Sequence, residues 1–142
     1  STAAMCQYPD FFKAAVSCAG NHDNNIYNRW WSETHHGVKE VVSEKGDTTF
    51  VYKIATNPEI AKNLKGHLML LHGDIDNNVH PGNTMRVGEA LIRAGKRFDM
   101  LMLPTQRHGF GDMNEYFYWR LVDHFTDYLI DGRTKQVDIP QR

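Results

Sequence analysis

The sequence predicts an α/β domain built on a sheet of about three parallel strands with flanking helices. Short apolar runs alternate with segments of helical periodicity, and polar side chains gather where the apolar runs end. This alternation is typical of parallel α/β units, in which the carboxyl ends of the strands meet at one edge of the sheet. The strand candidates are residues 12–20, 67–73 and 97–104, and the helix candidates are residues 57–66, 81–96 and 114–132.

The first twelve residues, STAAMCQYPDFF, have the small side chains of a helix that lies close to a sheet, and Pro9 ends it. The segment looks like the second half of a helix, so we expect the sequence to begin partway through a fold. The run FKAAVSCAG (12–20) follows. It is short, compatible with β structure and closed by Gly20, as expected of a buried strand.

The middle of the chain supplies the next helix and strand. NPEIAKNLKG (57–66) has Pro58 where the first turn of a helix would lie and Gly66 where the helix would stop. HLMLLHG (67–73) is a nearly unbroken apolar run. A strand that is buried on both faces has this pattern.

The last third repeats the alternation. PGNTMRVGEALIRAGK (81–96) predicts a helix that Asn83 or Thr84 caps and Gly95 ends. RFDMLMLP (97–104) predicts the third strand, and residues 114–132 predict an amphipathic helix. The apolar stripe of that helix consists of Phe117, Leu121, Phe125, Tyr128 and Leu129.

Composition limits the classes of function. The chain has 142 residues and a net charge of −1, which gives no electrostatic reason to expect nucleic acid or an anionic membrane as a partner. Its apolar runs fall short of the roughly 20 residues of a transmembrane helix. Two cysteines, Cys6 and Cys18, are too few for a disulfide framework, and we interpret them as small buried side chains.

Metal binding is the first explanation to test for the polar stretch HGDIDNNVH. Asp74, Asp76 and Asn78 have the spacing that opens a calcium-binding EF-hand loop. Val79, however, stands where that loop needs glycine, and Met85 stands where it needs a bidentate glutamate. Zinc is no better supported, because the eight histidines include no HExxH motif.

A catalytic dyad is the alternative. Asp76 follows one predicted strand and His108 follows the next, so both lie at the carboxyl edge of the sheet. A buried carboxylate that accepts a hydrogen bond from an imidazole fixes its tautomer and stabilises the imidazolium formed during proton transfer. Aspartate followed by histidine is also the order in α/β-hydrolases, whose serine precedes both.

The strings LMLLHGDIDNNVHPGNT and LPTQRHGF resemble the end of the prolyl oligopeptidase family of serine peptidases, above all its dipeptidyl peptidase IV branch. There an apolar strand runs into a His-Gly-x-x-Asp-x-Asn-Val-His loop, and a His-Gly pair follows the next strand. YPDFFKAAVSCAG is similar to the segment after the nucleophile helix, and NNIYNRWW to the helix of the substrate pocket. The likeness covers most of residues 1–132.

The resemblance implies a role for six residues. Asp76 and His108 match the aspartate and histidine of the catalytic triad, and Asn78 matches the amide that holds a carbonyl near the substrate's N-terminus. The walls of the pocket for the residue before the scissile bond match Val79, Tyr27 and Trp31. Relatives usually have tyrosine at the last position. From the residues alone, packing of Tyr27, Trp30 and Trp31 against the sheet is the favoured explanation, and the resemblance makes a pocket role for Tyr27 and Trp31 equally open.

The resemblance further implies that residues 1–142 are the C-terminal part of the catalytic α/β-hydrolase domain of a serine exopeptidase. Such an enzyme releases N-terminal dipeptides after Pro or Ala and needs no metal or organic cofactor. Its partners would be a peptide substrate, the remainder of the parent enzyme (a β-propeller and the N-terminal half of the hydrolase domain) and further copies in a homo-oligomer. We expect an extracytoplasmic location, the periplasm or the cell surface. The alternatives are a related peptidase or esterase of other specificity, or an inactive interaction module.

The nucleophile is expected outside this sequence. The turn that carries it reads Gly-x-Ser-x-Gly, and no such string occurs here. In the family this turn lies just before a stretch like STAAM, and the oxyanion donors come from earlier in the domain. We therefore expect the 142-residue chain to have no peptidase activity by itself.

Overall fold

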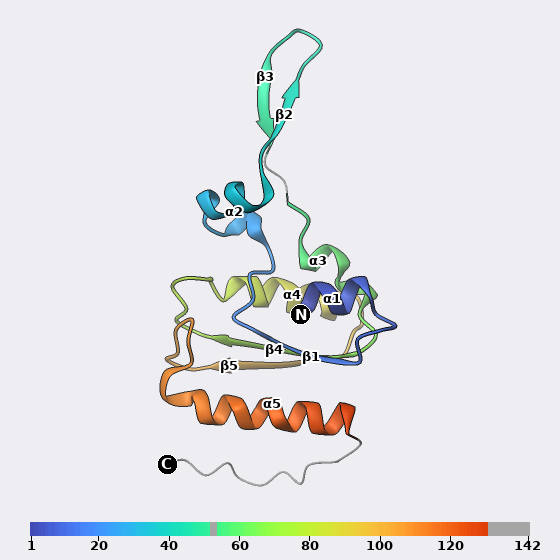
Figure 1. The fold of residues 1–142 in the computed structure, drawn as a ribbon, viewed down its shortest axis with the longest axis vertical. Helices are drawn as coiled ribbons and strands as arrows, with labels where there is room; N and C mark the ends of the chain where they lie inside the picture. The colour runs from blue at the N-terminus through green and yellow to red at the C-terminus, as the bar shows by residue number, and fades with distance from the viewer. Residues whose placement is uncertain (52–53, 131–142) are drawn as a thin grey trace.

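The computed structural model of the chain describes residues 1–51 and 54–130. Its centre is a parallel sheet in the order β1-β4-β5, formed by β1 (Ala14–Cys18), β4 (His67–Gly73) and β5 (Asp99–Leu103) (Figure 1). All three predicted strands are confirmed, with β1 and β5 shorter than expected. Since the pairings are parallel, the loops after the three strands leave from one edge.

Helices cover both faces of this sheet. On one face lie α1 (Thr2–Gln7), α3 (Asn57–Ile60) and α4 (Gly82–Arg93), and on the other lies α5 (Asn114–Leu129) (Figure 1). The predicted helix 114–132 is confirmed to residue 129, and its last two residues lie outside the described ones.

The helix predicted over 57–66 is shorter. The α-helical part ends at Ile60, and a 3-10 turn, Ala61–Asn63, follows it. Gly66 is therefore not a helix stop. A Cβ placed on it would lie 2.6 Å from the carbonyl oxygen of Lys13, so glycine lets the backbones before β1 and β4 approach each other closely.

The capping prediction for α4 is wrong. The helix begins at Gly82, directly after Pro81, and no side chain caps it. Asn83 and Thr84 are fully buried, and their polar atoms contact other segments that approach this end of the helix. Gly95 follows the helix with a φ of +65°, as predicted for its C-terminal end.

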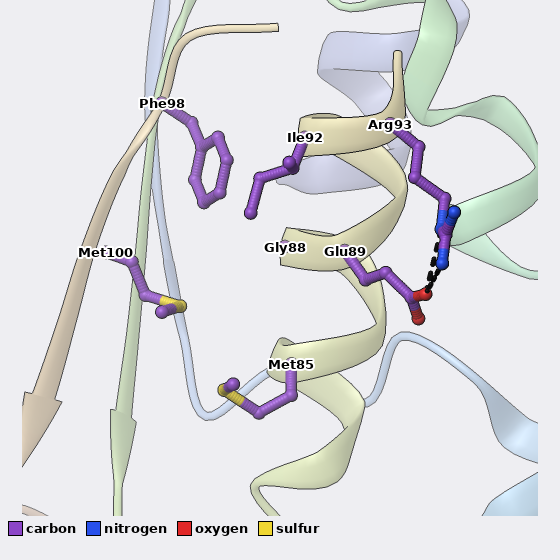
Figure 2. A pocket seen from close by; sticks show the side chains of 7 residues that line it. All are labelled: Met85, Gly88, Glu89, Ile92, Arg93, Phe98 and Met100. Carbon is purple, nitrogen blue, oxygen red and sulfur yellow. Dashed lines mark hydrogen bonds and ion pairs between the residues drawn. The ribbon is translucent and has the colours of Figure 1, made fainter. Parts of the chain in front are cut away.

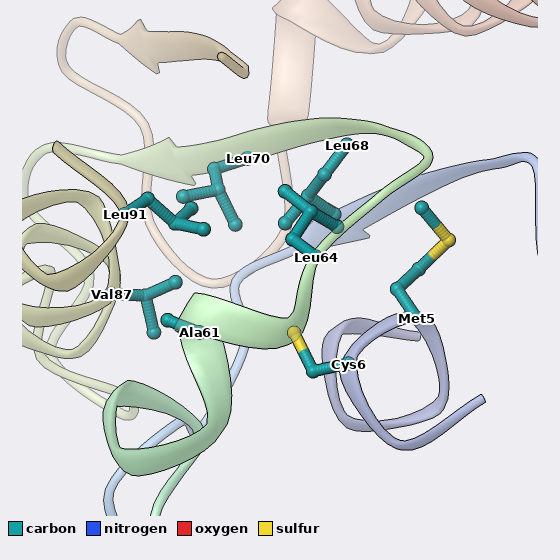
Figure 3. Packing of buried hydrophobic residues seen from close by; sticks show 8 residues of the cluster. All are labelled: Met5, Cys6, Ala61, Leu64, Leu68, Leu70, Val87 and Leu91. Carbon is teal, nitrogen blue, oxygen red and sulfur yellow. The ribbon is translucent and has the colours of Figure 1, made fainter. Parts of the chain in front are cut away.

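The main core lies between the sheet and the helices α1 and α4 (Figure 3). Leu68 and Leu70 of β4 face this side, whereas Leu71 joins a second cluster on the α5 side. Burial on both faces explains why β4 has an apolar run in place of an alternating pattern. The larger cluster consists of Met5, Cys6, Ala61, Leu64, Leu68, Leu70, Val87 and Leu91. Cys6 is a buried free thiol, as interpreted, whereas Cys18 is only partly buried.

A β-hairpin was not predicted. Helix α2 (Arg29–His36) leads into β2 (Lys39–Val42), which pairs with β3 (Thr48–Val51). The hairpin projects from the body of the molecule, and every residue of its two strands is exposed (Figure 1). Its turn contains Gly46 at a φ of +85°, which glycine adopts without strain.

A cavity of about 350 Å³ lies between α4 and β5 (Figure 2). Met85, Ile92, Phe98 and Met100 give it an apolar lining. Within residues 1–51 and 54–130, no helix combines the length and the apolarity needed to cross a membrane. The same residues contain no cluster of three or more histidine, cysteine or acidic side chains arranged for a metal ion.

Candidate active site

Asp76 and His108 meet at the carboxyl edge of the sheet. Asp76 lies in the loop after β4 and His108 in the loop after β5, and Nδ1 of the imidazole is 2.9 Å from Oδ2 of the carboxylate. The contact predicted from the sequence is therefore confirmed. Parallel pairing of β4 with β5 brings these residues together although 32 positions separate them in the chain.

The Asp76 carboxylate is held by its own loop. Its side chain is fully buried, and Oδ1 accepts hydrogen bonds from the backbone N–H groups of Asn78 at 2.9 Å and Val79 at 3.0 Å. Burial acts to raise the pKa of Asp76. The hydrogen bonds from His108 and from these two N–H groups outweigh it, so the pKa lies below its ordinary value of 3.8. The carboxylate is charged at neutral pH.

His108 presents one ring nitrogen outward. An ionised carboxylate only accepts hydrogen bonds, so Nδ1–H of His108 is the donor to Asp76. In neutral imidazole the proton on Nδ1 leaves Nε2 with a lone pair. The side chain is 46% exposed, and Nε2 has no hydrogen bond within the described residues. The ring can therefore accept a proton from a group placed beside it.

A second imidazole reaches the same carboxylate. Nε2 of His72, the penultimate residue of β4, lies 3.1 Å from Oδ2 of Asp76 and 2.8 Å from the carbonyl oxygen of Val79. Nδ1 of His72 lies 2.7 Å from the hydroxyl of Thr84 on α4. His72 is fully buried. Sequence reasoning gave this residue no role, although its spacing of four from Asp76 was visible.

Backbone contacts join the two loops. The N–H of Ile75 donates to the carbonyl of Gln106 at 3.2 Å, and the N–H of Asp74 donates to that of Leu103 at 3.1 Å. The buried Gln106 side chain donates to Asp112 at 3.0 Å. These bonds fix the loop of His108 against the loop of Asp76, so the dyad geometry does not depend on the two side chains alone.

The predicted pocket residues lie beside the dyad's loop. The Tyr27 hydroxyl donates to Oδ1 of Asn78 at 2.8 Å, which turns the amide NH2 of Asn78 away from Tyr27. Trp31, on α2, meets the Tyr27 ring edge-on with centroids 6.4 Å apart. Trp31 is 44% exposed and Trp30 is 73% exposed, so these two rings are not buried against the sheet.

Val79 differs from the other predicted pocket residues because it is buried, with 5% exposed. Its backbone N–H donates to Asp76, and its carbonyl faces Nε2 of His72. Val79 is therefore a buried residue of the Asp76 loop, and its backbone contacts both Asp76 and His72.

The segment that carries Tyr27 is anchored by a residue that sequence reasoning missed. Oδ1 of the buried Asn83 accepts hydrogen bonds from the N–H groups of His22 at 3.1 Å and Asp23 at 2.9 Å. Asp23 also pairs with Arg86 on α4 at 2.6 Å. These contacts tie the loop after β1 to α4 and so hold the Tyr27 segment beside the Asp76 loop.

His22 is a second buried imidazole near the site. Its Nδ1 lies 2.9 Å from the side-chain amide nitrogen of Asn57, which can only donate, so Nδ1 accepts. Burial, together with smaller contributions from charge on His72 and on the N-terminal amino group, lowers the pKa of His22 from its ordinary value of 6.5 to about 4. The ring is neutral at physiological pH.

Comparison with known proteins gives a consistent picture. The model of the prolyl oligopeptidase family matches residues 1–132. The chain is 28% identical over 131 residues to dipeptidyl peptidase 8 of Homo sapiens, covering 91% of this chain and 14% of that protein. It is 30% identical over 90 residues to dipeptidyl peptidase 4 of Trichophyton equinum, covering 63% of this chain and 11% of that protein.

Solved structures agree with the fold. The crystal structure of Porphyromonas gingivalis dipeptidyl peptidase 4 superposes with a TM-score of 0.75 at 28% identity, over 90% of this chain and 18% of that one. The chain thus spans less than a fifth of the length of these relatives.

Proposed function

The chain belongs to the prolyl oligopeptidase family, and from that premise we propose that it forms the C-terminal part of the catalytic α/β-hydrolase domain of a serine exopeptidase. The parent enzyme would release dipeptides from peptide N-termini, with Pro or Ala as the second residue. The observation that carries this proposal is the 2.9 Å contact between Asp76 and His108, with Nε2 of the ring left outward.

In the proposed reaction, Nε2 of His108 takes the proton of the parent's serine hydroxyl as the oxygen attacks the scissile carbonyl. The same nitrogen then gives that proton to the leaving amine. Asp76 holds the ring in the tautomer with hydrogen on Nδ1 and stabilises the imidazolium between these steps. The low pKa of Asp76 supports this role, because the carboxylate remains charged while the ring is protonated.

Substrate would lie along Tyr27, Trp31 and Asn78. The hydrogen bond from Tyr27 occupies the amide oxygen of Asn78, so the NH2 group remains to donate to a substrate carbonyl. The exposed Trp31 ring and the Tyr27 ring offer apolar surface to a small side chain such as proline. The buried Val79 would support the loop that carries Asn78 beside these two rings.

The nucleophile and the oxyanion donors would come from the remainder of the parent domain. Loss of the serine alone lowers turnover by roughly 10⁶-fold in a serine peptidase, because the triad acts as a unit. We therefore propose that the 142-residue chain alone is inactive and that the intact protein is active.

The test compares the two. Purified intact protein and the purified chain are assayed with a chromogenic Ala-Pro substrate, with the same substrate blocked at its amino group, and with a simple ester. We expect turnover of the unblocked peptide by the intact protein only, and its loss in His108→Ala. Turnover of the ester alone would favour an esterase, and no turnover by a folded intact protein would favour a non-catalytic module.

A further inference from the structure

His72 opens the motif that carries the family resemblance, but the resemblance gives its buried imidazole no role, and the mechanism proposed above does not use it. It nevertheless touches the central group of the site, since its Nε2 lies 3.1 Å from Oδ2 of Asp76. His108 donates to the same oxygen at 2.9 Å. Oδ2 is therefore shared by two imidazoles, one buried and one facing outward.

The surroundings of His72 determine where its proton lies. Nε2 faces the Asp76 carboxylate and the Val79 carbonyl, and both of these can only accept. A lone pair on Nε2 would face two negative oxygens, so Nε2 must carry hydrogen. In the neutral ring Nδ1 is then the acceptor, and the Thr84 hydroxyl at 2.7 Å is its donor.

With this assignment, all four contacts of the carboxylate are donors. Oδ1 receives the backbone N–H groups of Asn78 and Val79, and Oδ2 receives His108 and His72. Three of these donors come from the protein interior or the loop backbone. Only His108 must move a proton during turnover, so the other three can hold the carboxylate still while the His108 ring changes its charge.

We propose that His72 is a positioning residue for this site: it donates from Nε2 to Asp76, and Thr84 on α4 fixes its tautomer, so that a Thr84–His72–Asp76–His108 chain holds the outward imidazole. The catalytic meaning of this chain rests on the function proposed above, but the chain of hydrogen bonds does not. Within the described residues, the titratable groups that face Asp76 are His72 from β4 and His108 from the loop after β5. His22 is near enough for charge on His72 to affect it.

The first test needs no substitution. Long-range ¹H–¹⁵N NMR spectra of the labelled 142-residue chain at neutral pH report which ring nitrogen of each histidine carries hydrogen. We expect His72 as the Nε2–H tautomer. A His72 ring with hydrogen on Nδ1 would overturn the proposal, because Nε2 could not then donate to Asp76.

The second test measures whether the donor matters. The carboxyl ¹³C resonance of Asp76 is followed with pH in His72→Phe, which removes the donor, and in His72→Gln, whose amide can donate from a similar place. Loss of one donor should raise the pKa of Asp76 by roughly half to one pH unit in His72→Phe, and His72→Gln should remain close to wild type. His80→Gln, which removes an exposed imidazole from the same loop, is the control and should not change the Asp76 titration.

An unchanged Asp76 titration in a folded His72→Phe chain, or an equal change in His72→Phe and His72→Gln, would show that His72 only fills space. Neither test depends on peptidase activity. A failure of the His72 chain would therefore leave the proposed function in place, and the activity assay would decide that function separately.

Discussion

Gly73, the last residue of β4, lies directly beneath the backbone of Gln106. A Cβ placed on Gly73 would be 2.3 Å from the Gln106 carbonyl oxygen and 2.5 Å from that of Arg107. Both are backbone atoms of the loop that carries His108, and they cannot turn aside as a side chain could. The close approach of the two loops, and hence the dyad, requires glycine at this position.

Gly73→Ala should therefore move the His108 loop away from Asp76 and destabilise the chain by about 3 kcal/mol, the upper range for overpacking a well-filled site. Urea unfolding measures the change. The control is Gly109→Ala, because a Cβ on Gly109 meets no atom within 4 Å, and we expect a change of less than about 0.5 kcal/mol. Equal stabilities for the two variants would contradict the packing argument.

Asp76 should contribute to stability in a pH-dependent way. Its pKa is lower in the folded chain than its ordinary value of 3.8, so its contribution is fully present above that value and is lost as the pH falls through the folded-state pKa. The difference in unfolding free energy between wild type and Asp76→Asn should shrink below about pH 4. Denaturant unfolding of both chains at several pH values between about 2.5 and 6 would measure this difference in free energy. Asn77→Ala, a neutral change in the same exposed loop, should retain the wild-type dependence.

His22 should make stability depend on pH in a higher range than Asp76 does. Its folded-state pKa is about 4 against an ordinary value of 6.5, so the unfolded chain binds more protons between these values. Stability should fall as the pH is lowered from 6.5 to 4, by about 3 kcal/mol from this group. His22→Gln should remove that part of the slope in thermal or urea unfolding, whereas Asn21→Ala should keep it. A wild-type slope in His22→Gln would place the responsible group elsewhere.

Tyr27→Phe tests the pocket. The substitution keeps the ring but removes the hydroxyl that holds Oδ1 of Asn78, so the amide of Asn78 is free to rotate. In the proposed intact enzyme we expect KM for an Ala-Pro substrate to rise roughly 3- to 10-fold, as for the loss of one hydrogen bond, with little change in stability. Tyr118→Phe, on an exposed face of α5, is the matched control. An unchanged KM in Tyr27→Phe would remove Asn78 from the proposed substrate contacts.

The sequence predicted those helices and strands whose residue pattern follows from their own burial. The apolar run of β4 and the periodicity of α5 predicted those elements, and the polar loops after β4 and β5 predicted the contact between Asp76 and His108. Parallel pairing brings the ends of adjacent strands together, and the resemblance of both loops to the prolyl oligopeptidase family selected Asp76 and His108 among the polar residues there.

Prediction failed where partners come from distant segments. Asn83 looked like a helix cap, but its oxygen accepts from residues 60 and 61 positions away. His72 received no functional role, because the sequence pattern does not show its contacts with Thr84 on α4 and with Val79 in the following loop. The hairpin of β2 and β3 was missed because its short strands bury neither face and so lack an apolar alternation, although Gly46 and the β-branched residues around it were a usable signal.

The hairpin of β2 and β3 is under less structural constraint than the parallel sheet and its loops. It emerges between the helix of Trp31 and α3, and its strands add nothing to the parallel sheet that sets the dyad. Its length and composition can therefore change over evolutionary time, or an engineer can replace it with a reporter or an affinity module, while the contact between Asp76 and His108 retains its geometry.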